Sequence, residues 1–240
     1  MNERSPLDET AIAAMSADAA MAASAADFMR KSIDHRYSYN FSWLGVPIIQ
    51  YPQDIMALQE LMWADRPDLV IETGVAHGGS AVFFASMLEL LGGGKVVAID
   101  IDIRSHNRAV IESHPLAKRI ELVEGSSTDA AVVAFVAERV HAARSVLVVL
   151  DSNHTHAHVA RELDLYSPFV KRGGHIAVLD TIVEQLPGPF AGRPWGPGNS
   201  PGSAVEAFLA KNDRFTVDGG LSDKLLITVA PGGYLRCVKD

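Results

Sequence analysis

The chain has 240 residues, a length that suggests one large domain or one domain with an appendage. Apolar residues make up 48% of it and charged residues 21%, so it can bury a full core and is not expected to be disordered. Its 21 Lys and Arg against 29 Asp and Glu give a net charge of −8, and no basic block is present, so nucleic acid is not an expected partner.

The single cysteine, Cys237, excludes an intramolecular disulfide and suits a reducing compartment. The first ten residues are net acidic, and the Ala-rich stretch after them carries Asp18 and Asp27. Neither a signal peptide nor a membrane span fits this pattern. We therefore expect a cytoplasmic protein without a membrane partner.

The N-terminal region differs in character from the rest. Residues 8–30 are dominated by Ala, which predicts a helix with a weakly apolar face. The segment that follows has aromatic residues at every second position, as if lining one face of an extended chain: Tyr37, Tyr39, Phe41 and Trp43. Such a face either contacts an acceptor substrate or attaches the arm to the domain. We predict an arm over residues 1–50 and a domain over 51–240.

Strand and helix patterns alternate regularly from Asp68 onward. A helix is expected directly after Pro52, and further helices near residues 80–91, 104–113, 128–142 and 155–171. Between them stand short apolar runs, DLVIE, KVVAID, RIELVEG, SVLVVLD and GHIAVLD, typical of strands buried on both faces. This alternation predicts a doubly wound α/β fold with a parallel sheet and a ligand crevice at the carboxyl ends of its strands.

The C-terminal part has a different pattern. Three apolar stretches follow one another at 214–218, 224–230 and 234–238, separated by Gly- and Pro-containing turns. We expect antiparallel edge strands there. The fold class predicted is a mostly parallel, seven-stranded, Rossmann-like sheet with antiparallel C-terminal strands and an N-terminal helical arm.

The first strand leads into a glycine-rich turn, VIETGVAHGGS, over residues 70–80. Gly74, Gly78 and Gly79 allow a tight turn and a close approach to a ligand, and a helix is expected to begin near Ser80. Together with Asp100 this is also a near-match to a dinucleotide fingerprint. A nicotinamide cofactor and S-adenosylmethionine therefore both remain open at this point.

Two carboxylates bear on the choice of cofactor. Glu72 ends the first strand, where it could receive the ammonium of S-adenosylmethionine but would repel a pyrophosphate. Asp100 ends the second strand and could accept hydrogen bonds from both ribose hydroxyls of either cofactor. Both could instead be solvated strand-end caps. Glu72 favours S-adenosylmethionine.

The third strand ends in EGSSTD, where Ser127 and its neighbours are placed either to meet an adenine edge or to cap the helix expected near Thr128. Both interpretations stay open for Ser127 and Asp129.

Asp151 and Asp180 follow the fourth and fifth strands and are expected to converge at one edge of the sheet. Oxygen ligands suit Mg²⁺, which could hold a substrate hydroxylate and lower its pKa. The alternative is a zinc site at His154, His156 and His158. It is disfavoured because positions i, i+2 and i+4 do not share one helix face.

His154 lies just after Asp151 and is the candidate general base, because imidazole titrates near neutrality. Its alternative is a solvated histidine at a helix entry. The long loop over residues 181–205 is rich in Pro and Gly and contains Trp195, which predicts a lid over the acceptor. A structural loop packed on the arm is the alternative.

The motifs IETGVAHGGS, VVAIDIDIRSHNR, EGSSTD, LVVLDSNHTH, RPWGPGNSPGSAV and LLITVAPGGYLR together resemble the cephalosporin hydroxylase family, also labelled rhamnosyl O-methyltransferase. The resemblance runs from about residue 35 to the C-terminus. It implies a methyltransferase fold that uses S-adenosylmethionine with Mg²⁺ assistance and acts on sugars or natural products.

The resemblance also implies roles for particular residues. The cofactor turn contains Glu72 and Gly74, with Gly78 and Ser80 beside them; Asp100 meets the ribose, Ser127 the adenine, Asp151 the cofactor and the metal, and His154 resembles the base of related sugar methyltransferases. One departure is that Leu179 precedes Asp180 where the family usually has Glu. The site could bind Mg²⁺ weakly through Asp151 and Asp180, recruit Asn153, or work through His154 without metal.

The sequence thus predicts an S-adenosylmethionine-dependent O-methyltransferase that acts on a hydroxyl of a sugar or natural-product small molecule and forms a homo-oligomer. Asp151 and His154 are its predicted catalytic residues. The alternatives are a nicotinamide-dependent oxidoreductase and a cofactor-binding protein that has lost catalysis.

Overall fold

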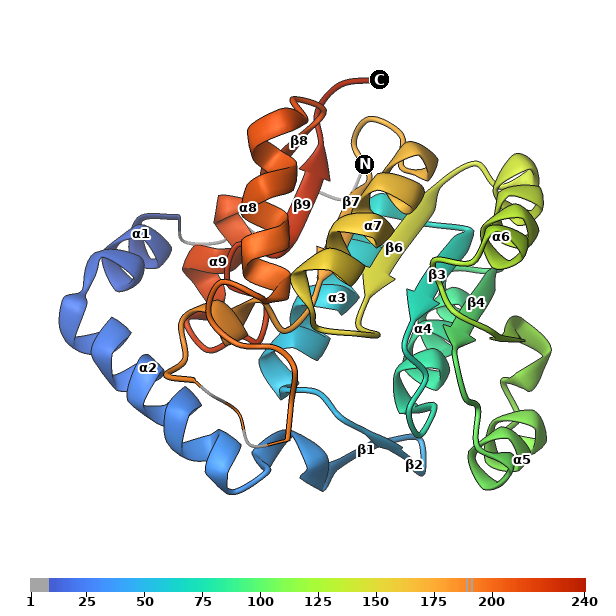
Figure 1. Cartoon of the computed structure of the whole chain (residues 1–240), viewed down its shortest axis with the longest axis horizontal. Helices are drawn as coiled ribbons and strands as arrows, with labels where there is room; N and C mark the ends of the chain where they lie inside the picture. Colours follow the sequence, from blue (N-terminus) through green and yellow to red (C-terminus); the bar gives the residue numbers. More distant parts are fainter. Residues whose placement is uncertain (1–8, 189, 191) are drawn as a thin grey trace.

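The computed structural model describes residues 9–188, 190 and 192–240. Its centre is a seven-stranded sheet in the order β5-β4-β3-β6-β7-β9-β8 (Figure 1). The strands are β3 (Leu69–Thr73), β4 (Lys95–Asp100), β5 (Ile120–Glu124), β6 (Val146–Leu150), β7 (His175–Val178), β8 (Phe215–Val217) and β9 (Tyr234–Cys237). The first five are parallel, whereas β9 is antiparallel to both β7 and β8. The predicted fold class is confirmed.

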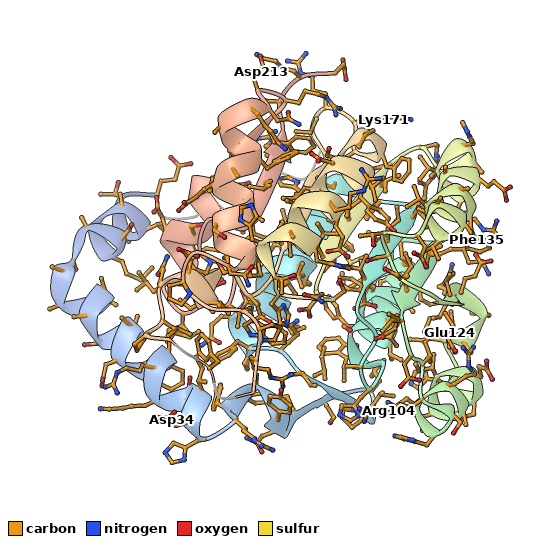
Figure 2. The ribbon with its side chains drawn as sticks, in the orientation of Figure 1. Asp34, Arg104, Glu124, Phe135, Lys171 and Asp213 are labelled. Carbon is orange, nitrogen blue, oxygen red and sulfur yellow. The ribbon has the colours of Figure 1, made fainter. Side chains whose placement is uncertain are left out.

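Helices cover both faces of the sheet, because each buried strand presents alternate side chains to opposite sides. In β3, Val70 packs with the first core cluster, whereas Leu69 and Ile71 pack with the second. The first cluster includes residues of α3 (Pro52–Asp65), α4 (Gly79–Leu90), α5 (Ser105–Ser113) and α9 (Gly219–Leu225). The second includes residues of α6 (Ala130–Ala142), α7 (His156–Tyr166) and α8 (Pro201–Lys211). Figure 2 shows side chains filling the space on both sides of the sheet.

The strand predicted over residues 224–230 is wrong. Residues 219–225 form α9, which begins beside Asp218, whose side chain accepts a hydrogen bond from the Leu221 N–H. The stretch after α9 is held by the buried Asp54 of α3, which accepts hydrogen bonds from the Val229 N–H at 2.9 Å and from the Thr228 and Tyr234 hydroxyls. The Asp54 carboxylate thus binds the Val229 N–H, which in a strand would have paired with a neighbouring strand.

The N-terminal arm contains two helices where the sequence predicts one. They are α1 (Glu9–Ala17) and α2 (Ala19–Asp34), and Asp18 separates them because its side chain caps α2 by accepting from the N–H groups of Ala20 and Met21. Residue 8, where the prediction begins, lies outside the described residues. No described helix is long and apolar enough to cross a membrane.

The aromatic segment is only partly extended. Tyr37 and Tyr39 lie in the 3₁₀ helix η1 (Tyr37–Asn40), so the prediction of one continuous extended face is wrong there; β1 (Phe41–Trp43) then pairs with β2 (Val46–Ile48). Most of these rings attach the arm to the domain: Tyr37 contacts Phe28 and Tyr51, and Trp43 contacts Phe83, with centroids 5.0–5.4 Å apart. The division at residue 50 stays a prediction.

Candidate active site

A cavity of about 570 Å³ opens at the carboxyl ends of the parallel strands. This is the edge at which ligands bind in open α/β sheets, and the volume is in the usual range for small-molecule sites. Six predicted site residues line it: Gly74, Ser80, Asp100, Ser127, Asp151 and Asp180. His154 lines it as well, whereas Glu72 and Gly78 lie just outside it.

The glycine turn requires glycine for steric reasons. Gly74 has φ +93°, and a Cβ there would lie 2.1 Å from the Asp151 carbonyl oxygen. Gly78 has φ +90°, and its Cβ would lie 2.3 Å from the Ile111 side chain. Gly74 therefore permits the close contact between β3 and β6 below the cavity, whereas Gly78 allows helix α5 to pack against the turn.

Glu72 is buried beneath the glycine turn. One of its carboxyl oxygens has no partner among the described residues. Burial raises the pKa of Glu72 to about 8, although a hydrogen bond from Ser80, which lines the cavity, acts in the opposite direction. A cation beside this carboxyl would favour its ionised form. The geometry thus suits the predicted ammonium contact, with Ser80 as a further polar group at the same place.

Asp100 is held against the glycine turn. Its Oδ2 accepts hydrogen bonds from the Val75 N–H at 2.8 Å and the Ala76 N–H at 3.3 Å, and its Oδ1 accepts from the Asp102 N–H at 3.2 Å. The carboxylate therefore orders the turn and also faces the cavity. The exposed apolar side chain of Ile101 lines the cavity next to it.

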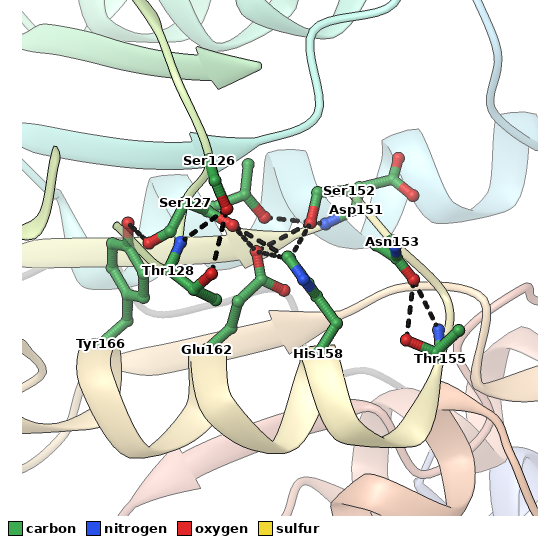
Figure 3. A network of polar contacts seen from close by, with 11 residues as sticks. Ser126, Ser127, Thr128, Asp151, Ser152, Asn153, Thr155, His158, Glu162 and Tyr166 are labelled. Carbon is green, nitrogen blue, oxygen red and sulfur yellow. Dashed lines mark hydrogen bonds and ion pairs between the residues drawn. The ribbon is translucent and has the colours of Figure 1, made fainter. Parts of the chain in front are cut away.

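Ser127 belongs to a polar network between the loops after β5 and β6 (Figure 3). Its hydroxyl donates to the buried Glu162 at 2.6 Å, and no side-chain cap is formed at the start of α6 by Asp129. The helix-capping alternative for these two residues is therefore not what the structure shows. Sequence reasoning missed Glu162, although a Glu among the buried positions Val159, Leu163 and Tyr166 of α7 is a readable signal.

Asp151, His154 and Asp180 come together in the wall of the cavity. One potential metal-ligand atom from each lies within 4.8 Å of the others, and His154 Nε2 is 3.2 Å from Asp180 Oδ2. Asp180 adopts a left-handed conformation, with φ +54°. The predicted convergence of the two carboxylates at one edge is what the structure shows.

The side-chain amide of Gln50 donates to Asp151 Oδ2 at 3.0 Å, and its own oxygen is buried without a partner among the described residues. Sequence reasoning missed Gln50, and no local pattern marks it. The pKa of Asp151 is raised well above its usual value by burial and by the nearby charges of Asp180 and Glu72. Such a concentration of buried carboxylates favours the binding of cationic groups.

The other two histidines of the zinc alternative have separate partners. His156 Nδ1 lies 2.8 Å from the Ser203 hydroxyl, and His158 Nε2 lies 3.1 Å from the Ser127 hydroxyl. The three imidazoles are therefore not gathered at one point, which removes the support for a three-histidine zinc site.

Asp151, Asp180 and His154 offer two carboxylates and one imidazole to a metal ion. Two carboxylates with room for water ligands satisfy the preference of this ion for oxygen. Leu179 contributes nothing, because its side chain is buried in the first core cluster. The residues present thus fit a divalent ion held by two carboxylates, with fewer protein ligands than the family pattern implies.

The prediction of one loop over residues 181–205 is wrong at both ends, because a 3₁₀ helix opens the segment and α8 begins at Pro201. The part between them lines the cavity through several side chains, including Leu186, Phe190 and Trp195. The Trp195 ring meets His154 edge to face, with centroids 4.8 Å apart. Glu184, in the 3₁₀ helix η4 (Thr181–Glu184), anchors the loop by accepting hydrogen bonds from the Gly198 N–H and the Ser200 hydroxyl. Residues 189 and 191 of the predicted lid lie outside the described residues, and closure stays a prediction.

Comparison with known proteins shows the family of the chain. The family model for Rhamnosyl O-methyltransferase/CmcI matches residues 35–238, and the chain belongs to this family. The rhamnosyl O-methyltransferase of Mycobacterium tuberculosis is 31% identical over 220 residues, covering 84% of this chain and 82% of its own. That of Mycobacterium leprae is 30% identical over 218 residues, covering 84% and 87%.

Solved structures show the same fold. A CmcI structure with Mg and SAM has a TM-score of 0.57 at 18% identity and covers 83% of this chain and 77% of that one. An apo structure of CmcI has a TM-score of 0.59 at 18% identity, with coverages of 84% and 78%. The predicted class, an S-adenosylmethionine-dependent O-methyltransferase, is thereby confirmed.

Proposed function

We propose that this methyltransferase transfers the methyl group of S-adenosylmethionine to a hydroxyl of a sugar or of a sugar-bearing natural product. The observation that carries the proposal is one cavity lined both by the glycine turn with Asp100 and by the cluster of Asp151, His154 and Asp180. The mycobacterial relatives are named for rhamnosyl acceptors, which favours a sugar hydroxyl.

The cofactor is assigned to the side of the cavity nearest the glycine turn. The Glu72 carboxylate neutralises the ammonium of its amino-acid part and is itself hydrogen-bonded by Ser80, while Asp100 accepts hydrogen bonds from the ribose hydroxyls. Ser127 and Ile101 border the place left for the adenine. Asp151 then lies toward the sulfonium, where its negative charge favours the bound cation.

The acceptor hydroxyl loses its proton to His154. One imidazole nitrogen of His154 faces Asp180, and the other, which has no hydrogen-bond partner among the described residues, takes the proton from a hydroxyl as its oxygen attacks the methyl group. Asp180 fixes the orientation of the ring and stabilises the imidazolium that forms, and Trp195 contacts the same ring. A new C–O bond forms as the C–S bond breaks, and S-adenosylhomocysteine leaves.

Asp151 and Asp180 would hold a Mg²⁺ ion, which when bound lowers the pKa of the acceptor hydroxyl and orients it. Gln50 keeps Asp151 in position for either the cofactor or the ion through its amide hydrogen bond.

Thermal unfolding tests the proposal. The purified protein is heated with S-adenosylmethionine, S-adenosylhomocysteine or NADH, each with and without Mg²⁺. A ligand at about 100 times its Kd adds roughly 2.7 kcal/mol, and each kcal/mol raises the midpoint by ~2–4 °C at this chain length. We expect a rise with the two sulfur compounds and none with NADH.

The two alternatives predict different results. Stabilisation by NADH alone would contradict the assignment of the cavity to S-adenosylmethionine and favour the oxidoreductase alternative. Stabilisation by S-adenosylhomocysteine without methyl transfer to any of a panel of rhamnosides, with or without Mg²⁺, would indicate a cofactor-binding protein without catalysis. Glu72→Gln should weaken binding of the sulfur cofactors, and Glu206→Gln, on the exposed side of α8, serves as its control.

The predicted homo-oligomer and cytoplasmic location also stay proposals. Exposed apolar side chains on α2, among them Met21, Phe28 and Ile33, support assembly through the arm. Light scattering of the full chain measures the mass in solution, and a monomer would contradict the first of these proposals.

A further inference from the structure

Glu162 is a buried acid with no part in the proposed methyl transfer. It projects from α7 toward the loops after β5 and β6 and is 0% exposed (Figure 3). Its Oε1 accepts hydrogen bonds from the hydroxyls of Ser127 at 2.6 Å and Ser152 at 2.8 Å. Its Oε2 is buried without a partner among the described residues. Burying an unpartnered carboxylate oxygen is unfavourable, so packing alone does not explain an acid at this position.

The protons of this network can be assigned by counting donors. A serine hydroxyl carries one proton, and Ser127 and Ser152 both donate theirs to Glu162. His158 Nε2 lies 3.1 Å and 3.2 Å from the two hydroxyl oxygens and 3.4 Å from Glu162 Oε1. These oxygens can then only accept from the imidazole, so Nε2 carries a hydrogen. In the neutral ring, Nδ1 is consequently a hydrogen-bond acceptor.

His158 is placed where it can meet a ligand. Its side chain is 21% exposed and lines the cavity together with Ser126 and Ser127. The Tyr166 hydroxyl donates a hydrogen bond of 2.7 Å to the backbone carbonyl of Ser127. Hydrogen bonds therefore fix both the backbone and the side chain of Ser127 in this part of the cavity wall. Among the described residues, no hydrogen-bond donor faces Nδ1. The network therefore offers a rigidly held acceptor at the end of the cavity that is assigned to adenine.

We propose that His158 recognises the 6-amino group of the cofactor's adenine through Nδ1, and that Glu162 is the positioning residue that fixes the imidazole in the required tautomer. This inference rests on the proposed function, since it assumes S-adenosylmethionine in the cavity. Adenine carries a donor at its 6-position, whereas hypoxanthine carries a carbonyl there. A nitrogen that only accepts hydrogen bonds distinguishes the two bases.

Calorimetric titration of the full chain with S-adenosylhomocysteine and with S-inosylhomocysteine tests the proposal. The wild type should bind the adenine compound on the order of tenfold more tightly. Nδ1 accepts a hydrogen bond from the amino group of adenine, whereas the carbonyl oxygen of hypoxanthine would face Nδ1 as a second acceptor. H158F should bring the ratio of the two Kd values close to one. E162L should reduce the ratio as well, whereas E162Q, which keeps an oxygen acceptor for both serines, should restore most of it.

D164N is the matched control, because Asp164 lies on the same helix and pairs with Lys211 at the surface. It should leave both Kd values unchanged. Should E162L fail to fold, H158F still decides the question. The proposal is overturned if H158F folds and keeps the wild-type ratio, which would leave the proposed function intact. If the wild type binds neither compound, the proposed function fails and this inference fails with it.

Discussion

The side-chain amide of Gln50 donates a hydrogen bond to the Asp151 carboxylate, with 3.0 Å between Nε2 and Oδ2. Gln50 lies just after β2 and is almost fully buried, and it brings the N-terminal segment into contact with the Asp151 carboxylate after β6. The segment that the aromatic pattern marks as an arm thus supplies a polar group to the active site.

Replacing Gln50 by Leu should lower kcat/KM roughly 10- to 100-fold, because a hydrogen bond to a charged group contributes about 1.5–3 kcal/mol. Steady-state methyl transfer measures the loss. Gln59→Leu, a half-buried glutamine of α3, is the control and should retain activity. Equal activity of the two variants would show that Asp151 does not need the amide.

Replacing His154 by Ala should reduce kcat by about 10²–10⁴-fold, the usual contribution of general-base assistance, while leaving the Kd of S-adenosylhomocysteine nearly intact. His141→Ala removes an exposed histidine of α6 and should change neither quantity. A loss below threefold in the first variant would remove His154 from the mechanism.

Asp180→Asn should weaken Mg²⁺ binding about tenfold or more, because it replaces one of two carboxylates by a neutral amide. Calorimetric titration with Mg²⁺ in the absence of acceptor measures this directly, and prior dialysis against EDTA should abolish any activation by the ion. Asp213→Asn, which removes a surface partner of Lys239, is the control. Unchanged affinity in Asp180→Asn would place the ion elsewhere.

The stability of the fold should depend on pH through His175. Burial lowers its pKa, but hydrogen bonds to Asp218 and to Asp65, the latter at 2.6 Å, outweigh this effect and leave the pKa raised above 6.5. The native state therefore holds this proton more tightly than the unfolded state does. The resulting stabilisation is complete below about pH 6.5 and is lost as the pH rises through the native pKa.

Melting temperatures of the wild type and His175→Gln from pH 6 to 9 test this. The difference between them should shrink as the pH rises. The pKa of Asp218 is lowered, with the hydrogen bond to His175 as the main cause, so its contribution is lost at the acid end instead. A constant difference across this range would show that His175 is neutral in the native protein.

Asp54→Ala should destabilise the protein by about 3 kcal/mol or more, since it leaves three buried donors without their acceptor at about 1–3 kcal/mol each. The melting temperature should fall by roughly 6–12 °C. Asp54→Asn keeps one oxygen and should lose less. A fall of under 2 °C in Asp54→Ala would mean that residues 226–230 are held by other contacts.

The fold could be predicted where the signal is local. The apolar run from Leu69 to Ile71 could be recognised as a buried strand because helices cover both sides of β3, and Asp151 and Asp180 could be placed together because parallel strands end at one edge. The stretch 224–230 carries the same kind of signal, but Asp54, far away in the sequence, binds its backbone. Such a contact overrides local preference and cannot be read from it.

The candidate site follows the same rule. Residues that stand directly at strand ends, such as Asp100 and Asp151, are found by position. Gln50 and Glu162 act across elements that only the folded chain brings together, so their neighbours in the sequence give little sign of their contacts. The spacing of the histidines makes His158 a possible zinc ligand, but its hydrogen bonds to Ser127 and Ser152 place it in another network.

The close approach of the N-terminal segment to α4 has a consequence for dividing the chain. A Cβ on Gly79 would lie 2.3 Å from the carbonyl oxygen of Pro47, so backbone rests on backbone there with no side chain between. A fragment beginning at residue 52 would retain every strand of the central sheet yet lack one wall of the cavity. A synthetic peptide spanning residues 35–51 should then restore cofactor binding to that fragment, as in a split enzyme whose two pieces reassemble.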